Sequence, residues 1–102
     1  MDREIRLSKR AVRKLDNLLV YLEKEWSSKS KSDFINKLDR SLKQIQKLPE
    51  SFPESEKMKG LRKCVVTKQT TFYFRYTDTT INIVTLFDNR QNPQSLFKES
   101  KD

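Results

Sequence analysis

The sequence contains no histidine, one cysteine, one glycine and three prolines. Without histidine, the side chain most often used for proton transfer near neutral pH is missing, so a lysine, a carboxylate or a tyrosine would have to do such work. The single cysteine, Cys64, excludes an internal disulfide and a cysteine-based zinc cluster. No apolar run reaches the length of a membrane span or a signal-peptide core. We therefore expect a cytoplasmic protein that needs no metal or cofactor and has no membrane contact.

Positive charge is what the chain has in excess. It carries 22 Lys and Arg against 14 Asp and Glu, which gives a formal net charge of +8. This balance favours a polyanionic or acidic partner such as a nucleic acid, a nucleoprotein or an acidic protein, although charge also serves to keep a surface solvated. The length of 102 residues suits one domain, spanning 1–102, around one core.

Two amphipathic helices are predicted in the first half of the chain. A short edge strand is predicted over Arg3 to Leu7. Ser8 follows as the expected N-cap of a helix. Apolar residues spaced by threes and fours predict this helix over Lys9 to Trp26. We expect Trp26 to lie in the core. Residues 27–31 indicate a turn, after which Ser32 or Asp33 could cap a second helix that Pro49 ends.

Most of the β-branched and aromatic residues lie in the stretch from Gly60 to Pro93. Strands are predicted over residues 61–67, 71–77 and 80–87, joined by the short polar turns Lys68-Gln69 and Asp78-Thr79. The preceding loop, 49–59, has Phe52 as its one expected anchor on the core. The predicted fold is therefore α+β, in the order β-α-α-β-β-β, with a helical hairpin packed on one face of an antiparallel sheet. A C-terminal helical turn is predicted at 94–98.

Two-residue turns would assign each side chain of this meander to a face. The face toward the helices would then hold Phe72, Phe74, Tyr76, Ile81, Ile83, Thr85 and Phe87. The open face would hold Tyr73, Arg75, Asn82, Val84, Leu86 and Asp88, joined by Arg62 and Cys64 from the first strand. Arg62 would lie opposite Arg75.

The order of these elements resembles the RelE/ParE superfamily, the toxins of bacterial type II toxin–antitoxin modules. The residues that carry the resemblance are Leu48-Pro49, Phe52-Pro53, Gly60-Leu61-Arg62, the strand Phe72 to Tyr76, and Phe87-Asp88-Asn89-Arg90-Gln91-Asn92-Pro93. The resemblance covers nearly the whole chain. It implies growth arrest by one of two routes, because RelE-like members cut mRNA in the ribosomal A site and ParE-like members poison DNA gyrase. It also implies a cognate antitoxin that wraps the toxin with a helix and an added strand.

The same resemblance implies where a site would lie. Arg62 matches the arginine that opens the first meander strand, and Arg90 matches the arginine after the last. The candidates for proton transfer are Tyr73 and Asp88, and two further candidates are Glu54 and Glu56. Arginine suits the charge that develops on a phosphate during cleavage.

Four further cations, Lys57, Lys59, Lys63 and Arg75, could bind a substrate or partner backbone. Arg62 and Arg90 could instead face the antitoxin or form ion pairs within the fold.

Two departures from the nuclease pattern lower the expectation of RNA cleavage. The chain has no histidine, and Thr71 occupies a position that is often basic in nuclease members. The sequence therefore leaves open an mRNA endonuclease and a gyrase inhibitor. The alternative to both toxin mechanisms is a non-catalytic basic module of the same fold that binds nucleic acid or an acidic protein.

Overall fold

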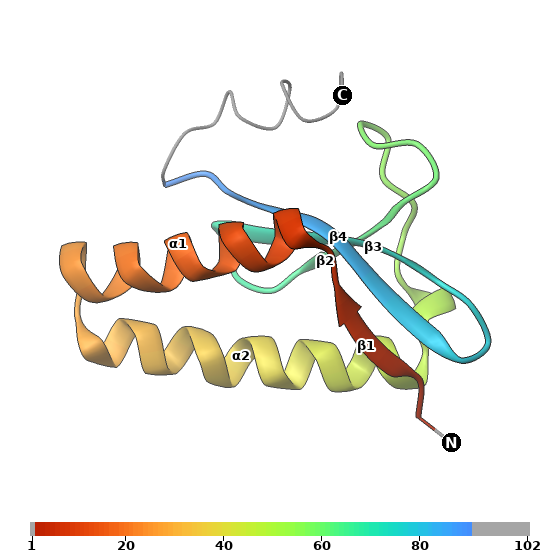
Figure 1. Ribbon diagram of the computed structural model, residues 1–102, viewed down its shortest axis with the longest axis horizontal. Coiled ribbons are helices and arrows are strands. Elements are labelled where there is room, and N and C mark those ends of the chain that lie inside the picture. Colours follow the sequence, from red (N-terminus) through yellow and green to blue (C-terminus); the bar gives the residue numbers. More distant parts are fainter. Residues whose placement is uncertain (1, 91–102) are drawn as a thin grey trace.

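Two long helices and four strands form the part of the chain that the computed structural model describes, residues 2–90 (Figure 1). Their bounds are β1 Glu4–Leu7, α1 Lys9–Glu25, α2 Ser28–Lys47, the short 3-10 helix η1 Pro49–Ser51, β2 Arg62–Val65, β3 Thr70–Tyr76 and β4 Thr80–Asp88. The predicted α+β order is confirmed. The helical turn predicted at 94–98 lies outside the described residues. None of the described helices is both long and apolar enough to cross a lipid bilayer.

The sheet is mixed, with the strand order β1-β4-β3-β2. β3 is antiparallel to both of its neighbours, as predicted, but β1 pairs parallel to β4. The prediction of an antiparallel sheet was wrong for this pair, because the direction of β1 depends on a pairing across more than 70 residues of intervening chain. The backbone N–H groups of Glu4 and Ser8 donate to Thr79 and Ile83. The edge position predicted for the first strand is confirmed.

Serine side chains cap both helices. The Ser8 hydroxyl accepts from Ala11 N at 3.0 Å, as predicted, and the Ser27 hydroxyl accepts from Ser30 N at 3.0 Å. The predicted turn at 27–31 was therefore wrong, since α2 begins at Ser28. Its first turn, Ser28–Lys31, carries no apolar residue and gives no periodicity.

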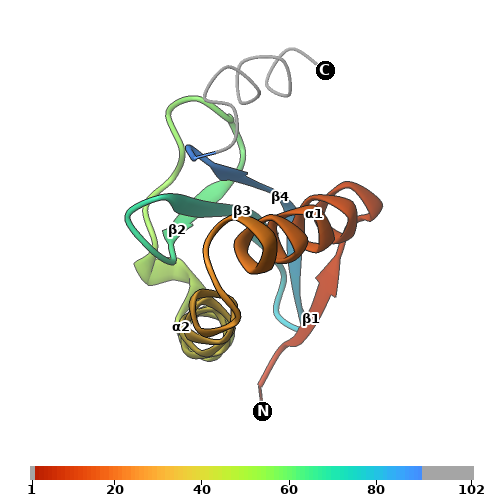
Figure 2. The same ribbon diagram turned by 90° about the vertical axis from the view of Figure 1, so that its left-hand side faces the viewer.

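Both helices pack against one face of the sheet, and Figure 2 shows the 52–61 loop above the sheet and α2 below it. The core is formed by Ala11, Leu18, Leu22, Phe34, Leu38, Ile45, Cys64, Phe72, Phe74, Ile81, Ile83 and Leu86. Phe52 anchors the loop as expected, with its ring edge-on to Phe74 at a centroid distance of 5.7 Å. Trp26 is not in the core, because it follows the last residue of α1 and its side chain is 56% exposed.

Because of a bulge next to the first turn of the meander, the side chains of β2 lie on the opposite face of the sheet from the one predicted. The turn residues are Lys68-Gln69, as expected, but the N–H groups of Val66 and Thr67 both donate to the carbonyl of Thr70. Two donors opposite one acceptor mark an extra residue in one strand, which shifts the register by one.

The shift reassigns two side chains that were predicted on the open face. Arg62 lies opposite Phe74 rather than Arg75, and Cys64 lies opposite Phe72. Both therefore belong to the face toward the helices, and Cys64 is 3% exposed.

A second irregularity divides β4. Phe74 pairs with Ile83 whereas the preceding residue, Tyr73, pairs with Thr85, so one residue of β4 is extra. Beyond this point the predicted alternation is inverted: Leu86 pairs with Phe72, and Asp88 pairs with the buried Thr70. Leu86 and Asp88 were therefore predicted on the wrong face, and so were Thr85 and Phe87.

The second face of the sheet is partly covered rather than open. A small apolar cluster forms there, in which Met58, Val84 and Phe87 pack around the buried pair Leu61 and Tyr73. The loop that supplies Met58 runs back along β2, with Ser55 N donating to Leu61 O at 2.7 Å and Lys63 N donating to Pro53 O at 2.9 Å. The single glycine, Gly60, makes the return possible because its φ of 83° lies in the left-handed region.

Candidate functional site

The end of β4 holds a buried ion pair between two residues that the sequence had marked as candidates. Asp88 has a side chain that is 0% exposed, and its Oδ2 lies 2.6 Å from Arg90 Nη2. Arg90 Nε donates to Asp88 Oδ1 at 3.0 Å, and the backbone N–H of Arg90 donates to the same oxygen at 2.9 Å. The hydroxyl of Thr70 donates to Oδ2 at 2.5 Å. The carboxylate therefore has partners at both oxygens.

This environment fixes the charge of Asp88. Burial alone would raise the pKa of the carboxyl, but the hydrogen bonds from Arg90 and Thr70 and the adjacent guanidinium charge outweigh burial and lower the pKa below its usual value. A carboxyl with a lowered pKa is ionised near neutral pH, so it has no proton to donate as a general acid. It is also a weak base. The geometry is that of a structural salt bridge.

Arg90 also contacts the exposed Trp26. Its guanidinium carbon lies 5.6 Å from the centroid of the indole ring, within cation–π range. The two residues line a half-open cleft of about 220 Å³, together with residues of α2 and of the β2–β3 turn (Ser30, Asp33, Phe34, Lys37, Thr67 and Gln69). The Asp88–Arg90–Trp26 contacts therefore tie the end of the sheet to the turn between the helices.

Arg62 is engaged at the opposite end of the strands. Its Nη1 donates to Phe52 O at 2.6 Å and to Glu50 O at 3.4 Å. Its guanidinium also lies 5.6 Å from the centroid of Tyr76, and Nη2 is 3.9 Å from the exposed Glu54. These contacts hold the chain after η1 against the edge of the sheet.

The structure does not bring Arg62 and Arg90 together. Arg62 is level with Phe74, and Phe74 is level with Ile83, whereas Arg90 lies seven residues after Ile83, just beyond the end of β4. A rise of about 3.3 Å per strand residue places the two arginines roughly 20 Å apart. The guanidinium of Arg62 lies over Tyr76 and that of Arg90 lies over Trp26, at opposite ends of the strands, so in this arrangement one phosphate group does not contact both.

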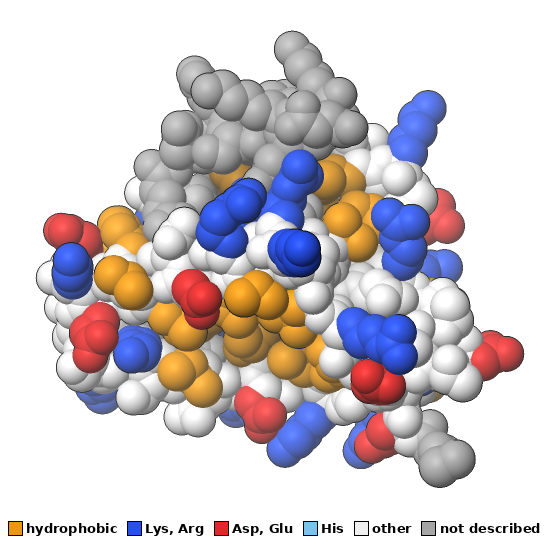
Figure 3. Space-filling view, in the orientation of Figure 1, with side chains coloured by type: hydrophobic (Ala, Val, Ile, Leu, Met, Phe, Trp, Pro, Cys, Tyr) orange, Lys and Arg blue, Asp and Glu red, His pale blue; other side chains and the backbone are white. Residues whose placement is uncertain are grey.

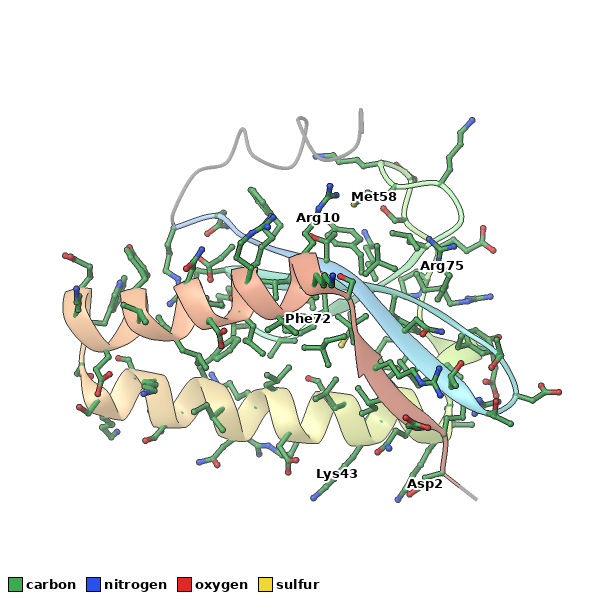
Figure 4. All side chains as sticks on the ribbon, viewed as in Figure 1. Asp2, Arg10, Lys43, Met58, Phe72 and Arg75 are labelled. Carbon is green, nitrogen blue, oxygen red and sulfur yellow. The ribbon has the colours of Figure 1, made fainter. Side chains whose placement is uncertain are left out.

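The remaining candidates are dispersed. Tyr73 is 5% exposed in the second apolar cluster, so it is not accessible to a substrate. Glu54, Glu56, Lys57, Lys59 and Lys63 are all exposed, and all but Lys63 lie in the 53–61 loop. Arg75 is exposed on the second face of the sheet, opposite Asn82 (Figure 4). These cations form parts of a surface rather than a pocket.

Sequence reasoning missed Arg3, which has a position similar to that of Arg62. Arg3 donates from Nε to Thr77 O at 2.8 Å and from Nη1 to Gln46 O at 3.2 Å. Its guanidinium lies 5.4 Å from the centroid of Tyr76, the same ring that Arg62 contacts. No local signal predicts this cluster, because Arg3 precedes β1, Arg62 lies in β2 and Tyr76 lies in β3.

Metal and thiol chemistry find little support in the described part of the chain. Residues 2–90 contain no group of three metal-ligating side chains. Burial raises the pKa of the Cys64 thiol, although a hydrogen bond with Ser41 opposes the shift, so this cysteine is a poor nucleophile.

Comparison with known families decides the assignment. Residues 5–93 match the model of a family described as the ParE toxin of the type II toxin–antitoxin system parDE. The chain belongs to this family. It is a ParE-family toxin of a type II toxin–antitoxin system, which confirms the resemblance drawn from the sequence. No curated protein matches the chain.

Solved structures of other toxins share the fold of this ParE-family chain. A structure described as the chromosomal ParDE system of P. aeruginosa superimposes with a TM-score of 0.68 at 15% identity, covering 84% of this chain and 95% of the other. The E. coli DinJ–YafQ toxin–antitoxin complex gives a TM-score of 0.60 at 14% identity, covering 91% and 99%. At these identities the similarity establishes the fold alone. Both descriptions name toxin–antitoxin systems.

Proposed function

We propose that this ParE-family toxin arrests growth by binding DNA gyrase and stabilising the gyrase complex with cleaved DNA. The observation that carries the proposal is that the residues suited to RNA cleavage are dispersed or already engaged. Arg62 and Arg90 lie roughly 20 Å apart by strand register. A toxin that acts by binding requires a surface and no catalytic group.

Cleavage of RNA makes demands that these positions meet poorly. A base must reach a ribose hydroxyl, an acid must reach the leaving oxygen, and a cation must lie close to the phosphate between them. Asp88 is held by Arg90 and Thr70, and Tyr73 is buried beneath Met58 and Val84. The exposed carboxylates Glu54 and Glu56 lie in a loop, away from Arg90.

The test is an assay of the purified chain against both targets. With gyrase, ATP and plasmid, we expect loss of supercoiling and accumulation of cleaved plasmid that denaturation of gyrase releases. With translating ribosomes, we expect the mRNA to remain intact. Codon-dependent cuts in the mRNA would overturn the proposal in favour of an endonuclease. A chain that is inactive in both assays would overturn it in favour of a binding module without toxicity.

A cognate antitoxin is the second partner that we propose. Its binding site would be the apolar band between α1 and α2 beside β1, which Figure 3 shows as a continuous hydrophobic area. Val12 and Ile35 are 45% and 43% exposed, and the side chains of Leu7, Leu15, Leu19 and Leu42 next to the core are only partly buried. An amphipathic helix from the antitoxin would bury these side chains, as helices do in hydrophobic grooves.

A pair of matched substitutions tests this site. Val12→Asp places a charge in the band, whereas Val65→Asp makes the same change on β2, where Val65 is 63% exposed. We expect Val12→Asp to weaken binding of the antitoxin encoded beside the toxin gene and Val65→Asp to leave it unchanged, as measured by calorimetry. Equal losses in the two variants would show that the band is not the binding site.

A further inference from the structure

The start of α1 carries an unusual concentration of positive charge. Between residues 6 and 15 the chain has five cations and no acidic residue, namely Arg6, Lys9, Arg10, Arg13 and Lys14. Arg6 is paired with Glu4 at 3.2 Å, just as Lys29 and Lys43 of α2 are paired with Asp33 and Asp39 at 3.8 and 3.1 Å, so the excess of cations over nearby carboxylates is what distinguishes this segment.

Their position works against helix stability. The first turn of α1 contains no acidic residue, so Lys9 and Arg10 lie at the positive end of the helix dipole. Cations at this end interact unfavourably with the dipole and destabilise the helix. Replacing one of them with a neutral residue would remove its share of this destabilisation. A segment whose charges work against the local helix rule is a candidate for a surface with another use.

Residues of the sheet extend this positive charge. Arg6 of β1 pairs with Asn82 of β4, and Asn82 pairs with Arg75 of β3, so the two arginines share the second face of the sheet. Two strand spacings of about 4.8 Å separate their backbones. In Figure 4 Arg75 and Arg10 lie in the same upper half of the molecule, away from Lys43 on α2. Figure 3 shows Lys and Arg side chains gathered over this region.

The basic surface is thus made of Arg6, Lys9, Arg10, Arg13, Lys14 and Arg75. Lys9 lies nine residues before the buried Leu18, about 180° round the helix, so it faces directly outward. Arg13 follows one turn later, about 6 Å along the helix. Lys9 and Arg13 line a pocket with Leu7 and Val12, so they lie at the rim of the apolar band proposed for the antitoxin.

We propose that the basic surface binds the phosphate backbone of duplex DNA without sequence specificity. Regularly spaced cations on one outward-facing helix suit a row of phosphates, and backbone contacts of this kind supply most non-specific affinity for DNA. Single-stranded nucleic acid is usually held by exposed aromatic rings, and the basic surface includes no aromatic residue. The Ser8 hydroxyl is occupied by the carbonyl of Val84 and the N–H of Ala11, so it is not available for the ribose hydroxyls of duplex RNA.

The experiment compares two double variants with equal changes in charge and composition. Lys9→Gln/Arg13→Gln alters the basic surface, and Arg40→Gln/Lys43→Gln removes one lysine and one arginine from the exposed side of α2. Binding of each purified chain to a fluorescent 30-base-pair duplex of random sequence is measured by anisotropy over a range of salt concentrations. Gyrase is absent, so the result does not depend on the toxin's target.

We expect the native chain to bind the duplex with an affinity that falls steeply as salt rises. Neutralising Lys9 and Arg13 should reduce the slope of log affinity against log salt by about 2, close to one per cation removed, and the α2 variant should retain the native slope. Thermal melting provides the check on folding, since Lys9→Gln removes an unfavourable charge from the helix start and should not lower Tm. Equal slopes for the two variants, or tighter binding of single-stranded or duplex RNA than of DNA, would overturn the proposal.

Discussion

Replacing Asp88 with asparagine should destabilise the protein strongly at neutral pH. The substitution keeps the size of the side chain but leaves the Arg90 guanidinium, whose side chain is 16% exposed, without its anionic partner. Removing one member of a buried ion pair costs about 3–5 kcal/mol. Because asparagine still offers one oxygen to Thr70 or Arg90, we expect a loss near 3 kcal/mol. That is a large part of the roughly 5–15 kcal/mol by which small domains are stable.

The loss should depend on pH in one direction. The pKa of Asp88 is lowered in the folded protein, so near and below the unfolded pKa of about 3.9 the unfolded chain binds more protons than the folded one. The stabilisation that the carboxylate provides is therefore complete above the unfolded pKa and is lost as the pH falls through the folded pKa. Each unit by which the pKa is lowered contributes about 1.4 kcal/mol.

Urea unfolding followed by circular dichroism at a series of pH values between 2 and 7 measures this effect. The matched control is Asp78→Asn, which makes the same chemical change at an exposed turn position and should shift stability by less than about 0.5 kcal/mol. The difference between the native chain and Asp88→Asn should shrink at the acid end of the series. A loss below about 1 kcal/mol at pH 7, or a difference that stays constant with pH, would refute the assignment of Asp88 as a structural anion.

Three further outcomes follow from the contacts of single residues. Gly60→Ala should cost about 1–2 kcal/mol in urea unfolding, because no atom lies within 4 Å of the added methyl and the strain comes from the φ of 83° alone; Gly60→Asn should cost less. Arg62→Lys should lower stability by about 1–2 kcal/mol, since lysine lacks the planar guanidinium that lies over Tyr76 and donates to Phe52 O at the same time; unchanged melting with lost toxicity would instead place Arg62 in a binding site. Cys64 should resist thiol reagents at pH 8 in the folded protein and react fully in urea, and stoichiometric labelling without urea would contradict its burial.

Much of the fold follows from local patterns. Apolar residues at helical spacing located α1 and most of α2, and Ser8 and Pro49 indicated where α1 begins and α2 ends. The β-branched and aromatic residues located the meander, and the turn at Asp78-Thr79 has the predicted length, with Tyr76 opposite Ile81. These signals were readable because each lies within a few residues of the element that it specifies.

The face of the sheet on which each candidate site residue lies could not be predicted in the same way. A bulge beside Thr67 turned Arg62 and Cys64 toward the helices, and an extra residue in β4 did the same for Asp88. Each bulge adds one residue to one strand, and a single residue reverses every side chain beyond it. No composition or spacing in the strands marks either insertion.

The sequence by itself determined the class of the protein: its element order, its excess of positive charge and its membership of the toxin family. Only the tertiary structure decided which charges are engaged within the fold and which face outward. Asp88, Arg90 and Arg62 are held by partners that strand pairing and loop packing bring to them, whereas Lys9 and Arg13 project from a helix whose opposite side is buried. The physical reason is that helix periodicity is a local property, but the register of a sheet depends on hydrogen bonds between distant parts of the chain.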